Sequence, residues 1–419
     1  MGHFRFRCTE CGAFYEESKT QLTCNACAMA QQPGGVLRGV LEVVLNELPA
    51  AWPAAPPASP EFLQAFLPLP SIEFLPTLSV GGTPLLPVPH LRRALGMNDL
   101  WVKDDTRNPS GSTKDRASLL VVAKAKEYGC ETIAAASTGN AATALAAIAA
   151  AAGVRAIVFV PATAPEAKLV QMQSYGAVVL PVEGTYDQAF ELCLEACREF
   201  GWYNRNTALN PFTIEGKKTA ALEIAAALAP EEPDAVLVPT GDGVILAGVA
   251  KGFADLKRCG LLRRTPRLIA VQPEGSAAIV NALRSGAETI NRVPHAASVA
   301  DSLTVETPRN ALQCLRVVRA SQGAGITVSD SAILKAIADL ARLTGVFAEP
   351  AGAAALAGLH AALEQKSVGR DERVVLLVTG TGLKDIGAAS RAIKKPAPIP
   401  VRLDAVAERM RGSPDGSWA

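Results

Sequence analysis

The chain has 419 residues, which is long enough for two or three domains. Hydrophobic residues make up 49% of it and aromatic residues only 5%, so aliphatic side chains must build most of the core. The formal net charge of +1 gives no electrostatic reason to expect a nucleic-acid or anionic-membrane partner. The Ala-rich run 134–154 is broken by a turn and is too short as a helix to span a bilayer, and the N-terminus lacks an apolar signal core. We therefore expect a cytoplasmic protein with no membrane or nucleic-acid partner.

Four cysteines near the N-terminus form two Cys-x2-Cys pairs, which twelve residues separate. They are Cys8, Cys11, Cys24 and Cys27. Four thiolates at this spacing are typical of a small zinc ribbon, in which the closed tetrahedral site is structural and has no open position for catalysis. A disulfide pair, which the cytosol disfavours, and a ribbon that has lost its metal are the alternatives. The spacing thus predicts a zinc-ribbon-like module over residues 1–48, with a strand at 40–45.

The elements predicted after this module indicate parallel sheets. A Pro/Ala-rich connector occupies residues 49–80, and a body of alternating strands and helices occupies 81–395. Short apolar runs between amphipathic helices are typical of parallel α/β sheets. The predicted strands are 100–103, 132–136, 155–160, 178–181, 235–238, 268–272 and 374–379, and the predicted helices are 114–128, 141–152, 165–174 and 186–200. Residues 396–419 are Pro-rich and then Gly/Ser-rich, which predicts a mobile tail.

Lys114 stands at the first of three strand-to-helix turns that point to chemistry. It ends a run of turn-forming residues and opens an apolar helix. A lysine at this end of a helix is unfavourable, because the helix dipole already makes that end positive. A lone lysine is usually a solvated surface residue. The alternative is that its amine forms a Schiff base with a carbonyl cofactor, and the other two turns support this reading.

The other two turns predict anion-binding sites. Residues 137–140 (STGN) connect the strand 132–136 to an Ala-rich helix, and residues 239–248 (PTGDGVILAG) follow the apolar strand 235–238. Hydroxyls, glycines and backbone N–H groups at a positive helix end can hold a carboxylate or a phosphate. Plain helix capping would explain the STGN turn taken alone. Three such turns in one chain favour a cofactor site at the carboxyl ends of the strands, where open α/β sheets bind ligands.

These motifs, in their order along the chain, resemble those of pyridoxal-phosphate (PLP) enzymes of the tryptophan-synthase-β fold type, and most of all those of the threonine synthases. The matching segments are NPSGSTKDR (108–116), STGN (137–140), NPFTIEGKKTAALEI (210–224), PTGDGVILAG (239–248), FAEPAGAAALAGL (347–359) and VTGTGLKD (378–385), and together they span roughly residues 81–390. The resemblance implies an α/β protein of fold type II, in which two open parallel-sheet domains of three layers each hold PLP between them. The smaller subdomain would take about 112–210 and the larger about 81–111 plus 211–395. A homodimer is also implied.

The resemblance further implies a role for each site residue. Lys114 would be the Schiff-base lysine and the proton shuttle, Asn140 would hydrogen-bond the phenolic oxygen of PLP, and Thr379 would meet its pyridine nitrogen. A neutral hydroxyl at that nitrogen favours elimination and replacement over transamination. Gly241, Asp242, Gly243, Val244 and Ile245 would form the phosphate cup, Ser137 and Thr138 would hold the substrate carboxylate, and Asn206 and Thr207 would meet the substrate phosphate. Near a positive helix end and partly desolvated, Lys114 should have a lowered pKa, as a general base requires.

The implied activity is that of a PLP-dependent lyase of threonine biosynthesis, which converts O-phospho-L-homoserine and water to L-threonine and phosphate. Three positions depart from the family's pattern. Ala141 stands where a hydroxyl is common, Thr213 where an arginine is common, and Asp242 where asparagine is more familiar. Loss of the arginine removes a bidentate phosphate clamp, and a carboxylate in a phosphate cup is unfavourable unless it turns onto backbone donors away from the anion.

Because of these departures, other activities stay open. Lys217, Lys218, Arg205 or Thr207 could replace the lost arginine. A related β-replacement enzyme such as cysteate synthase would use O-phosphoserine and sulfite. A threonine/serine dehydratase or a diaminopropionate ammonia-lyase needs no clamp for a substrate phosphate. Outside the enzymes, a non-catalytic cofactor-binding or zinc-ribbon interaction protein is the alternative, and release of phosphate, of ammonia or of neither separates these hypotheses.

Overall fold

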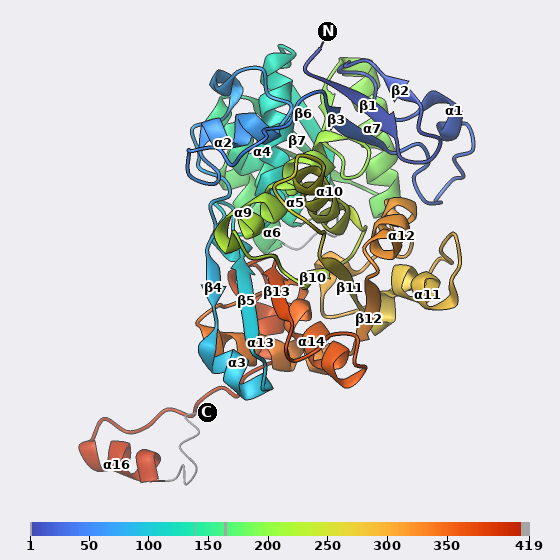
Figure 1. Ribbon diagram of the computed structural model, residues 1–419. Helices are drawn as coiled ribbons and strands as arrows, with labels where there is room; N and C mark the ends of the chain where they lie inside the picture. Colours follow the sequence, from blue (N-terminus) through green and yellow to red (C-terminus); the bar gives the residue numbers. More distant parts are fainter. Residues whose placement is uncertain (1, 138, 163–165, 412–419) are drawn as a thin grey trace.

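Three β-sheets organise the computed structural model, which describes residues 2–137, 139–162 and 166–411 (Figure 1). The large sheet has the strand order β12 (Ala324–Val328), β11 (Arg267–Pro273), β10 (Ala235–Pro239), β13 (Arg373–Val378), β5 (Asp99–Asp104) and β4 (Leu85–Pro87). Its neighbours are parallel except β4, which pairs antiparallel with β5. The all-parallel prediction thus misses this edge strand. The edge position suits β4, because an edge strand can carry a proline such as Pro87.

The small sheet has four parallel strands in the order β8 (Val178–Val182), β7 (Arg155–Pro161), β6 (Thr132–Ala136) and β9 (Tyr203–Asn204). Alternate residues of a strand face opposite sides of a sheet. Ile133 and Ala135 of β6 pack in one cluster with α4 (Lys114–Glu127) and α5 (Asn140–Ala152), whereas Ala134 and Ala136 pack with α7 (Tyr186–Phe200). Helices therefore cover both faces, and the small sheet is the centre of a three-layer unit.

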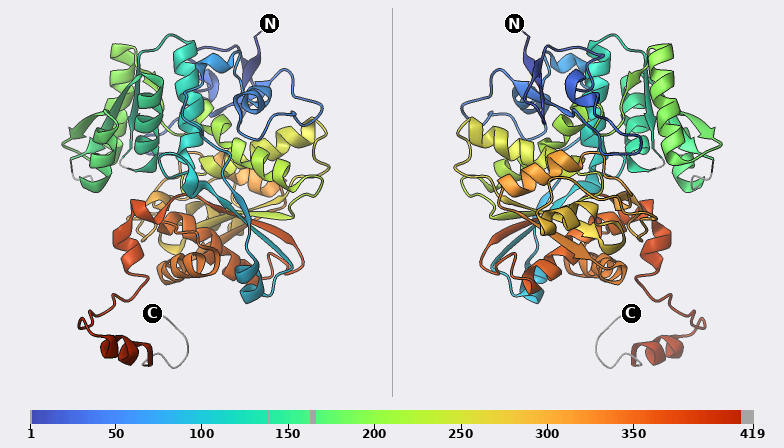
Figure 2. Two further views of the ribbon diagram at one scale, coloured as in Figure 1. Left: turned by 90° about the vertical axis from the view of Figure 1, so that its left-hand side faces the viewer. Right: turned by 90° about the vertical axis from the view of Figure 1, so that its right-hand side faces the viewer.

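Helices cover the large sheet in the same way. The side chains of Val374 and Leu376 in β13 share one cluster with α3 (Pro89–Leu95), α13 (Asp330–Thr344) and α14 (Pro350–Glu364). Those of Val375 and Leu377 share another with α9 (Thr219–Leu228), α10 (Val244–Arg258), α11 (Ala278–Ser285) and α12 (Ala311–Ala320). The other helices of the body are α6 (Glu166–Ser174), α8 (Phe212–Lys217) and α15 (Ile386–Ser390). Figure 2 shows the two three-layer units one above the other, as fold type II requires.

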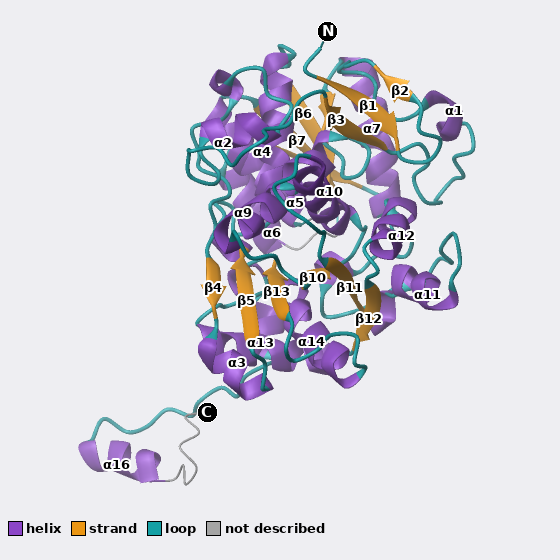
Figure 3. Ribbon diagram, in the orientation of Figure 1, coloured by secondary structure: helices purple, strands orange, loops and turns teal. Residues whose placement is uncertain are grey.

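The N-terminal module packs firmly on this body. Its antiparallel sheet has the order β2 (Phe14–Tyr15), β1 (Phe4–Cys8) and β3 (Leu41–Leu45), and α1 (Asn25–Ala28) follows Cys24. Phe4 and Phe6 are buried, and their rings lie 5.8 and 5.6 Å from the ring of Phe212, centroid to centroid. The module therefore shares a hydrophobic core with the small unit, and Figure 3 shows its strands beside the helices of the body.

The connector and the tail each contain a helix that the sequence analysis did not predict. In the connector, α2 (Pro60–Phe66) buries Phe62 and Phe66 in the cluster of the large sheet, so this segment contributes to the core. In the tail, α16 (Leu403–Arg411) lies away from the body, and its mobility stays a prediction (Figures 1 and 2). In the part of the chain that the structure describes, no helix is long and apolar enough to cross a membrane.

A buried ion network holds α4 in place. Arg116, two residues after Lys114, binds Asp105 with an N–O distance of 2.7 Å and Glu223 with one of 2.5 Å, and none of these three side chains is more than 3% exposed. Lys103 of β5 binds the same Glu223 at 2.6 Å. Burial alone would raise the pKa of Asp105, but the charges of Arg116 and Lys103 outweigh it and hold that pKa at about 2. The network thus joins the start of α4 to β5 and α9.

We expect Arg116→Met to lower the free energy of unfolding by about 3–5 kcal/mol, because it leaves two buried carboxylates without their main cation. Arg93→Met is the matched control, since Arg93 is exposed on α3 and should change that free energy by no more than about 0.5 kcal/mol. Urea unfolding of both variants measures the difference. Equal effects of the two substitutions would contradict the importance of the network.

Candidate active site

The three predicted turns come together around one cavity of about 790 Å³. Lys114 lines it, with Ser137 and Asn140 after β6 and the segment 241–245 after β10. These positions are at the carboxyl ends of strands from both sheets, where open α/β sheets bind ligands. The structure therefore assembles at one place residues that the sequence spreads over more than a hundred positions.

Lys114 is the first residue of α4, and the backbone before it is fixed to the end of β13. The Thr113 amide donates to the Thr379 carbonyl at 2.8 Å, and Ser112 forms a β-bridge with Gly380. Burial lowers the pKa of Lys114, the carboxylate of Glu349 acts in the opposite direction, and the positive charge of Arg205 lowers the pKa further. The sequence analysis predicted a lowered pKa for Lys114, and the structure agrees, with burial as the main cause.

The segment 241–245 forms a glycine turn at the start of the 15-residue helix α10. Gly243 has a φ of +88°, and a Cβ at this position would lie 2.9 Å from the Cβ of Cys314, so this site needs glycine. The first N–H groups of a helix and its dipole together favour a bound phosphate. The carboxylate of Asp242 accepts a hydrogen bond of 3.0 Å from the Arg309 amide. This is the backbone donor that an acidic residue in a phosphate cup requires.

Asn140 and Thr379, the two residues expected to contact the ring of the cofactor, are both buried. The amide of Asn140, at the start of α5, donates to Glu349 Oε1 at 2.7 Å, and both side chains are buried. Glu349 precedes α14, so this bond joins the two three-layer units. Thr379 is 4% exposed and is not among the cavity-lining residues. Their contacts with the cofactor stay predictions.

Only some of the residues assigned to substrate binding lie at the cavity with polar groups that a substrate can reach. Ser137 is at the cavity, while Thr138 lies outside the described residues. Asn206 Oδ1 accepts from the Ala136 amide at 2.8 Å, and its Nδ2 contacts Cys193 Sγ at 3.6 Å. Asn206 therefore supports the end of β6, and its contact with a substrate phosphate stays a prediction. Thr207 lines the cavity and accepts from Arg205 at 3.5 Å.

Arg205 and Lys217 are two buried cations in the cavity wall, and the sequence analysis named them only as possible replacements for the lost arginine. Each is 1% exposed. Arg205 donates to Ser118 Oγ at 3.2 and 3.3 Å. The Lys217 ammonium donates to the Thr213 carbonyl at 3.0 Å, and within the described residues no ion pair involves it. Burial lowers the pKa of Lys217 well below its usual value, and the charges of Arg205 and Lys114 add to this effect. The sequence signal was the first lysine in EGKKT.

Two of the departures from the family's pattern, Ala141 and Thr213, lie in different environments. Ala141 lines the cavity, so no hydroxyl reaches it from that position. Thr213 is fully buried, and its hydroxyl donates to the Asn210 carbonyl at 2.7 Å. Thr213 thus closes a turn inside the protein and does not replace an arginine. Lys218 is also buried in an ion network, with Glu215 and with Asp255 at 2.8 Å. Of the proposed substitutes, Arg205, Thr207 and Lys217 therefore face the cavity.

The cavity also has walls that the motifs did not indicate. They come from the loop 301–309 and from Gly34 and Gly35 of the N-terminal module. Arg309 reaches from this loop to α7, where it binds Asp187 at 2.9 Å and lies 4.0 Å from the ring centroid of Phe190. No pattern in the sequence connects these segments, because they meet only through the tertiary fold.

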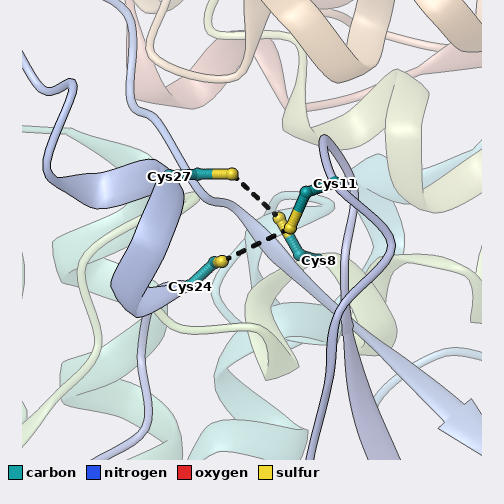
Figure 4. A group of neighbouring side chains, drawn as sticks. All are labelled: Cys8, Cys11, Cys24 and Cys27. Atoms are coloured by element: carbon teal, nitrogen blue, oxygen red, sulfur yellow. Dashed lines mark hydrogen bonds between the residues drawn. The ribbon is translucent and has the colours of Figure 1, made fainter.

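The four N-terminal cysteines form one cluster, and all their sulfur atoms lie within 4.8 Å of one another (Figure 4). The Sγ atoms of Cys8 and Cys27 are 3.8 Å apart, and those of Cys11 and Cys24 are 3.6 Å apart. A tetrahedron with metal–sulfur bonds of about 2.3 Å has edges of about 3.8 Å, so the cluster has the arrangement of a zinc site. Among the described residues it is the one group of three or more potential metal ligands of this kind.

The donors around the cavity fit PLP. They provide a partly buried amine at Lys114, a glycine turn at the N-terminus of α10 for the phosphate, and an amide at Asn140. Residues 76–380 match the family model described as "Pyridoxal-phosphate dependent enzyme". The processed form of threonine deaminase isoform 2 from Solanum lycopersicum has a similar fold, with a TM-score of 0.65 and 24% identity, covering 75% of this chain and 87% of that chain. Fold and site thus define a PLP-dependent enzyme of fold type II.

Relatives of nearly equal length narrow this class. The threonine synthase of Methanosarcina acetivorans is 35% identical over 98% of this chain and 99% of its own. The threonine synthase of Methanocaldococcus jannaschii is 34% identical over 94% of this chain and 96% of its own. The chain belongs to the threonine synthase family, a group of PLP-dependent lyases with amino-acid substrates.

We expect covalent attachment of PLP to Lys114 to have a pH midpoint below the ordinary lysine pKa of about 10.4, since the neutral amine is the reacting form. Arg205→Met should move this midpoint upward, because loss of a nearby positive charge favours the ammonium. Arg292→Met is the control, since Arg292 also lines the cavity but is exposed and paired with Glu306. A pH series of PLP absorbance with PLP-free protein gives the midpoints. An unchanged or lower midpoint in Arg205→Met would rule out this electrostatic effect.

Proposed function

We propose that this protein converts O-phospho-L-homoserine and water to L-threonine and phosphate. The observation that carries the proposal is a second group of anion-binding residues in the cavity, apart from the helix end that suits the phosphate of PLP. Arg205 and Lys217 are buried cations there, and Lys217 contacts no carboxylate among the described residues. A buried ammonium without a counter-ion is unfavourable, so its place is explained by a substrate that brings a dianion.

PLP, when bound, supplies a conjugated ring that delocalises the electron pair left when the substrate loses a proton. The protein's own part is to hold groups and to move protons. Lys114 removes protons first at Cα and then at Cβ, and its lowered pKa keeps the amine available as a base. The phosphate leaves from Cγ, and water adds at Cβ. The Asn140–Glu349 bond joins the two units beside the site where these steps take place.

Arg205 and Lys217 hold the substrate phosphate in this proposal. A phosphate dianion next to Lys217 favours the charged ammonium and so opposes the effect of burial on its pKa. Binding of the substrate and protonation of Lys217 therefore support each other. Thr207 adds a hydroxyl, while Ser137 and Thr138 are proposed to bind the carboxylate. The arginine that is common in the family at position 213 is then unnecessary, since Lys217 brings a positive charge from one helical turn further on.

A second candidate reaction is β-replacement on O-phosphoserine, as in cysteate synthase. Ala141 favours it, since this position of the cavity wall lacks the hydroxyl that is common in the family. The substrates of a dehydratase or an ammonia-lyase carry no phosphate, so they offer no dianion for the two buried cations to bind. The two buried cations thus support a phosphorylated substrate more strongly than any residue supports phosphohomoserine over phosphoserine.

We further propose that the protein is a cytoplasmic homodimer with zinc in residues 1–48 and with the subdomain limits given above. The cysteines support the location, because none of the nine forms a disulfide and disulfides are rare in the cytosol. Light scattering of the purified protein tests the dimer.

We expect the purified protein to release phosphate from O-phospho-L-homoserine and to form threonine in equal amount. Lys114→Ala should abolish both, because it removes the group that moves the protons. O-phosphoserine, with and without sulfite, is assayed alongside. Phosphate release from phosphoserine alone would transfer the proposal to the β-replacement reaction, and release of ammonia without phosphate would exclude both.

Lys217→Met should lower kcat/KM for phosphohomoserine by about 10- to 100-fold, the value of one hydrogen bond to a charged group. Lys217→Arg is the matched control and should retain much of the activity, because the positive charge remains. PLP absorbance should be the same in both variants, since Lys217 is outside the phosphate cup. An unchanged kcat/KM in Lys217→Met would show that this lysine does not hold the substrate.

A further inference from the structure

The N-terminal module forms part of the wall of the active site. The loop after α1 brings Gly34 and Gly35 to the cavity that also contains Lys114. This loop begins directly after the knuckle that holds Cys24 and Cys27 (Figure 4). The cysteine cluster and the cofactor site are therefore connected by a short stretch of chain, although a structural metal site needs no such connection.

Backbone hydrogen bonds from residues beside the cysteines fix the end of this loop. The Cys24 amide donates to the Gly39 carbonyl at 2.8 Å, and the Thr9 amide donates to the Val40 carbonyl at 2.9 Å. On the other side, the Gly39 amide donates to Glu10 Oε1 at 2.5 Å. Both cysteine knuckles thus hold residues 39 and 40, so the position of Val40 depends on the geometry of the cluster.

The same stretch contacts the phosphate cup. Val40 is 3% exposed and packs in one apolar cluster with Val244, the first residue of α10, and Leu37 packs against this cluster from its edge. The Leu37 amide also donates to the Arg309 carbonyl at 2.9 Å, and the Arg309 amide in turn holds the carboxylate of Asp242 at 3.0 Å. Two separate contacts, one apolar and one hydrogen-bonded, therefore lead from the module to the cup.

We propose that Leu37 and Val40 are positioning residues for the phosphate cup, and that metal binding at the four cysteines and PLP binding at the cup strengthen each other. A bound metal holds the knuckles together, which keeps residues 37–40 against α10 and Arg309. Without the metal, four thiols at this distance have no bond to hold them, and PLP binding must then order the loop as well. The proposal rests on PLP binding alone and holds for either phosphorylated substrate.

The test compares zinc-loaded and zinc-depleted protein. The Kd of PLP is measured from its absorbance on PLP-free protein of each form, and the Kd of zinc is measured with and without PLP. Zinc should tighten PLP binding by about fivefold or more, and PLP should tighten zinc binding by the same factor, since coupling between two sites is reciprocal. Equal PLP affinity in both forms would overturn the proposal. No substrate is used, so failure of the phosphohomoserine assay does not affect this result.

Two substitutions in the module separate positioning from general stability. Val40→Ala shortens the side chain that packs in the cluster of Val244, whereas Val43→Ala shortens a fully buried side chain of β3 that packs in the cluster of Phe4 and Phe6. Both lose the same two methyl groups from the module. Val40→Ala should weaken PLP binding by about fivefold or more, and Val43→Ala should leave it unchanged at a similar loss of thermal stability. Equal PLP affinity of the two variants would mean that the module acts only through overall stability.

Discussion

The position of Lys114 depends on the buried ion network around Arg116. A buried ion pair is favourable only when its geometry is good, so Arg116 fits Asp105 and Glu223 in one arrangement of β5, α4 and α9. Because Lys114 is only two residues away on the same helix, this arrangement also fixes where its amine emerges. Gly216 adds a second constraint, since a side chain there would collide with the backbone of Arg116. The helix that carries Lys217 therefore lies directly on α4, and both lysines reach the same cavity.

The cavity wall collects positive charge, because the buried Arg205 and Lys217 line it together with Lys114. Lys114, Arg205 and Lys217 repel one another at low dielectric, which lowers the pKa of both lysines together with burial. One consequence is that the Lys114 amine gives up its proton more readily than an exposed lysine, which suits a base. The other is a site that gains from anions, and two different structures provide for them. The end of α10 offers backbone N–H groups, which bind a phosphate without a formal charge of their own, whereas Arg205 and Lys217 offer full charges.

The edges of this site come from segments that no motif marks. Arg309 joins the loop 301–309 to α7 through Asp187 and Phe190, and its backbone amide donates a hydrogen bond to the carboxylate of Asp242. The N-terminal module supplies Gly34 and Gly35 and packs Val40 against α10. A zinc module usually stabilises its own small fold, because four closed ligands leave no room for chemistry. In this protein the loop of the module also contacts the catalytic body at the cavity and at α10. The module is therefore part of the wall of the active site.

The sequence by itself determined most strands of the two larger sheets and the local chemistry of each turn. Strand β6 and helix α7 have the predicted bounds, since short apolar runs and capped amphipathic helices are local patterns. The four cysteines and the Lys114, Asn140 and 241–245 turns were also legible, because each motif lies within a few residues. Only the tertiary structure decided that β4 runs antiparallel, that Thr213 turns inward while Lys217 and Arg205 line the cavity, and that Val40 meets Val244. These facts depend on contacts between residues far apart in the chain, and the burial that gives such contacts their energy does not exist until the chain has folded.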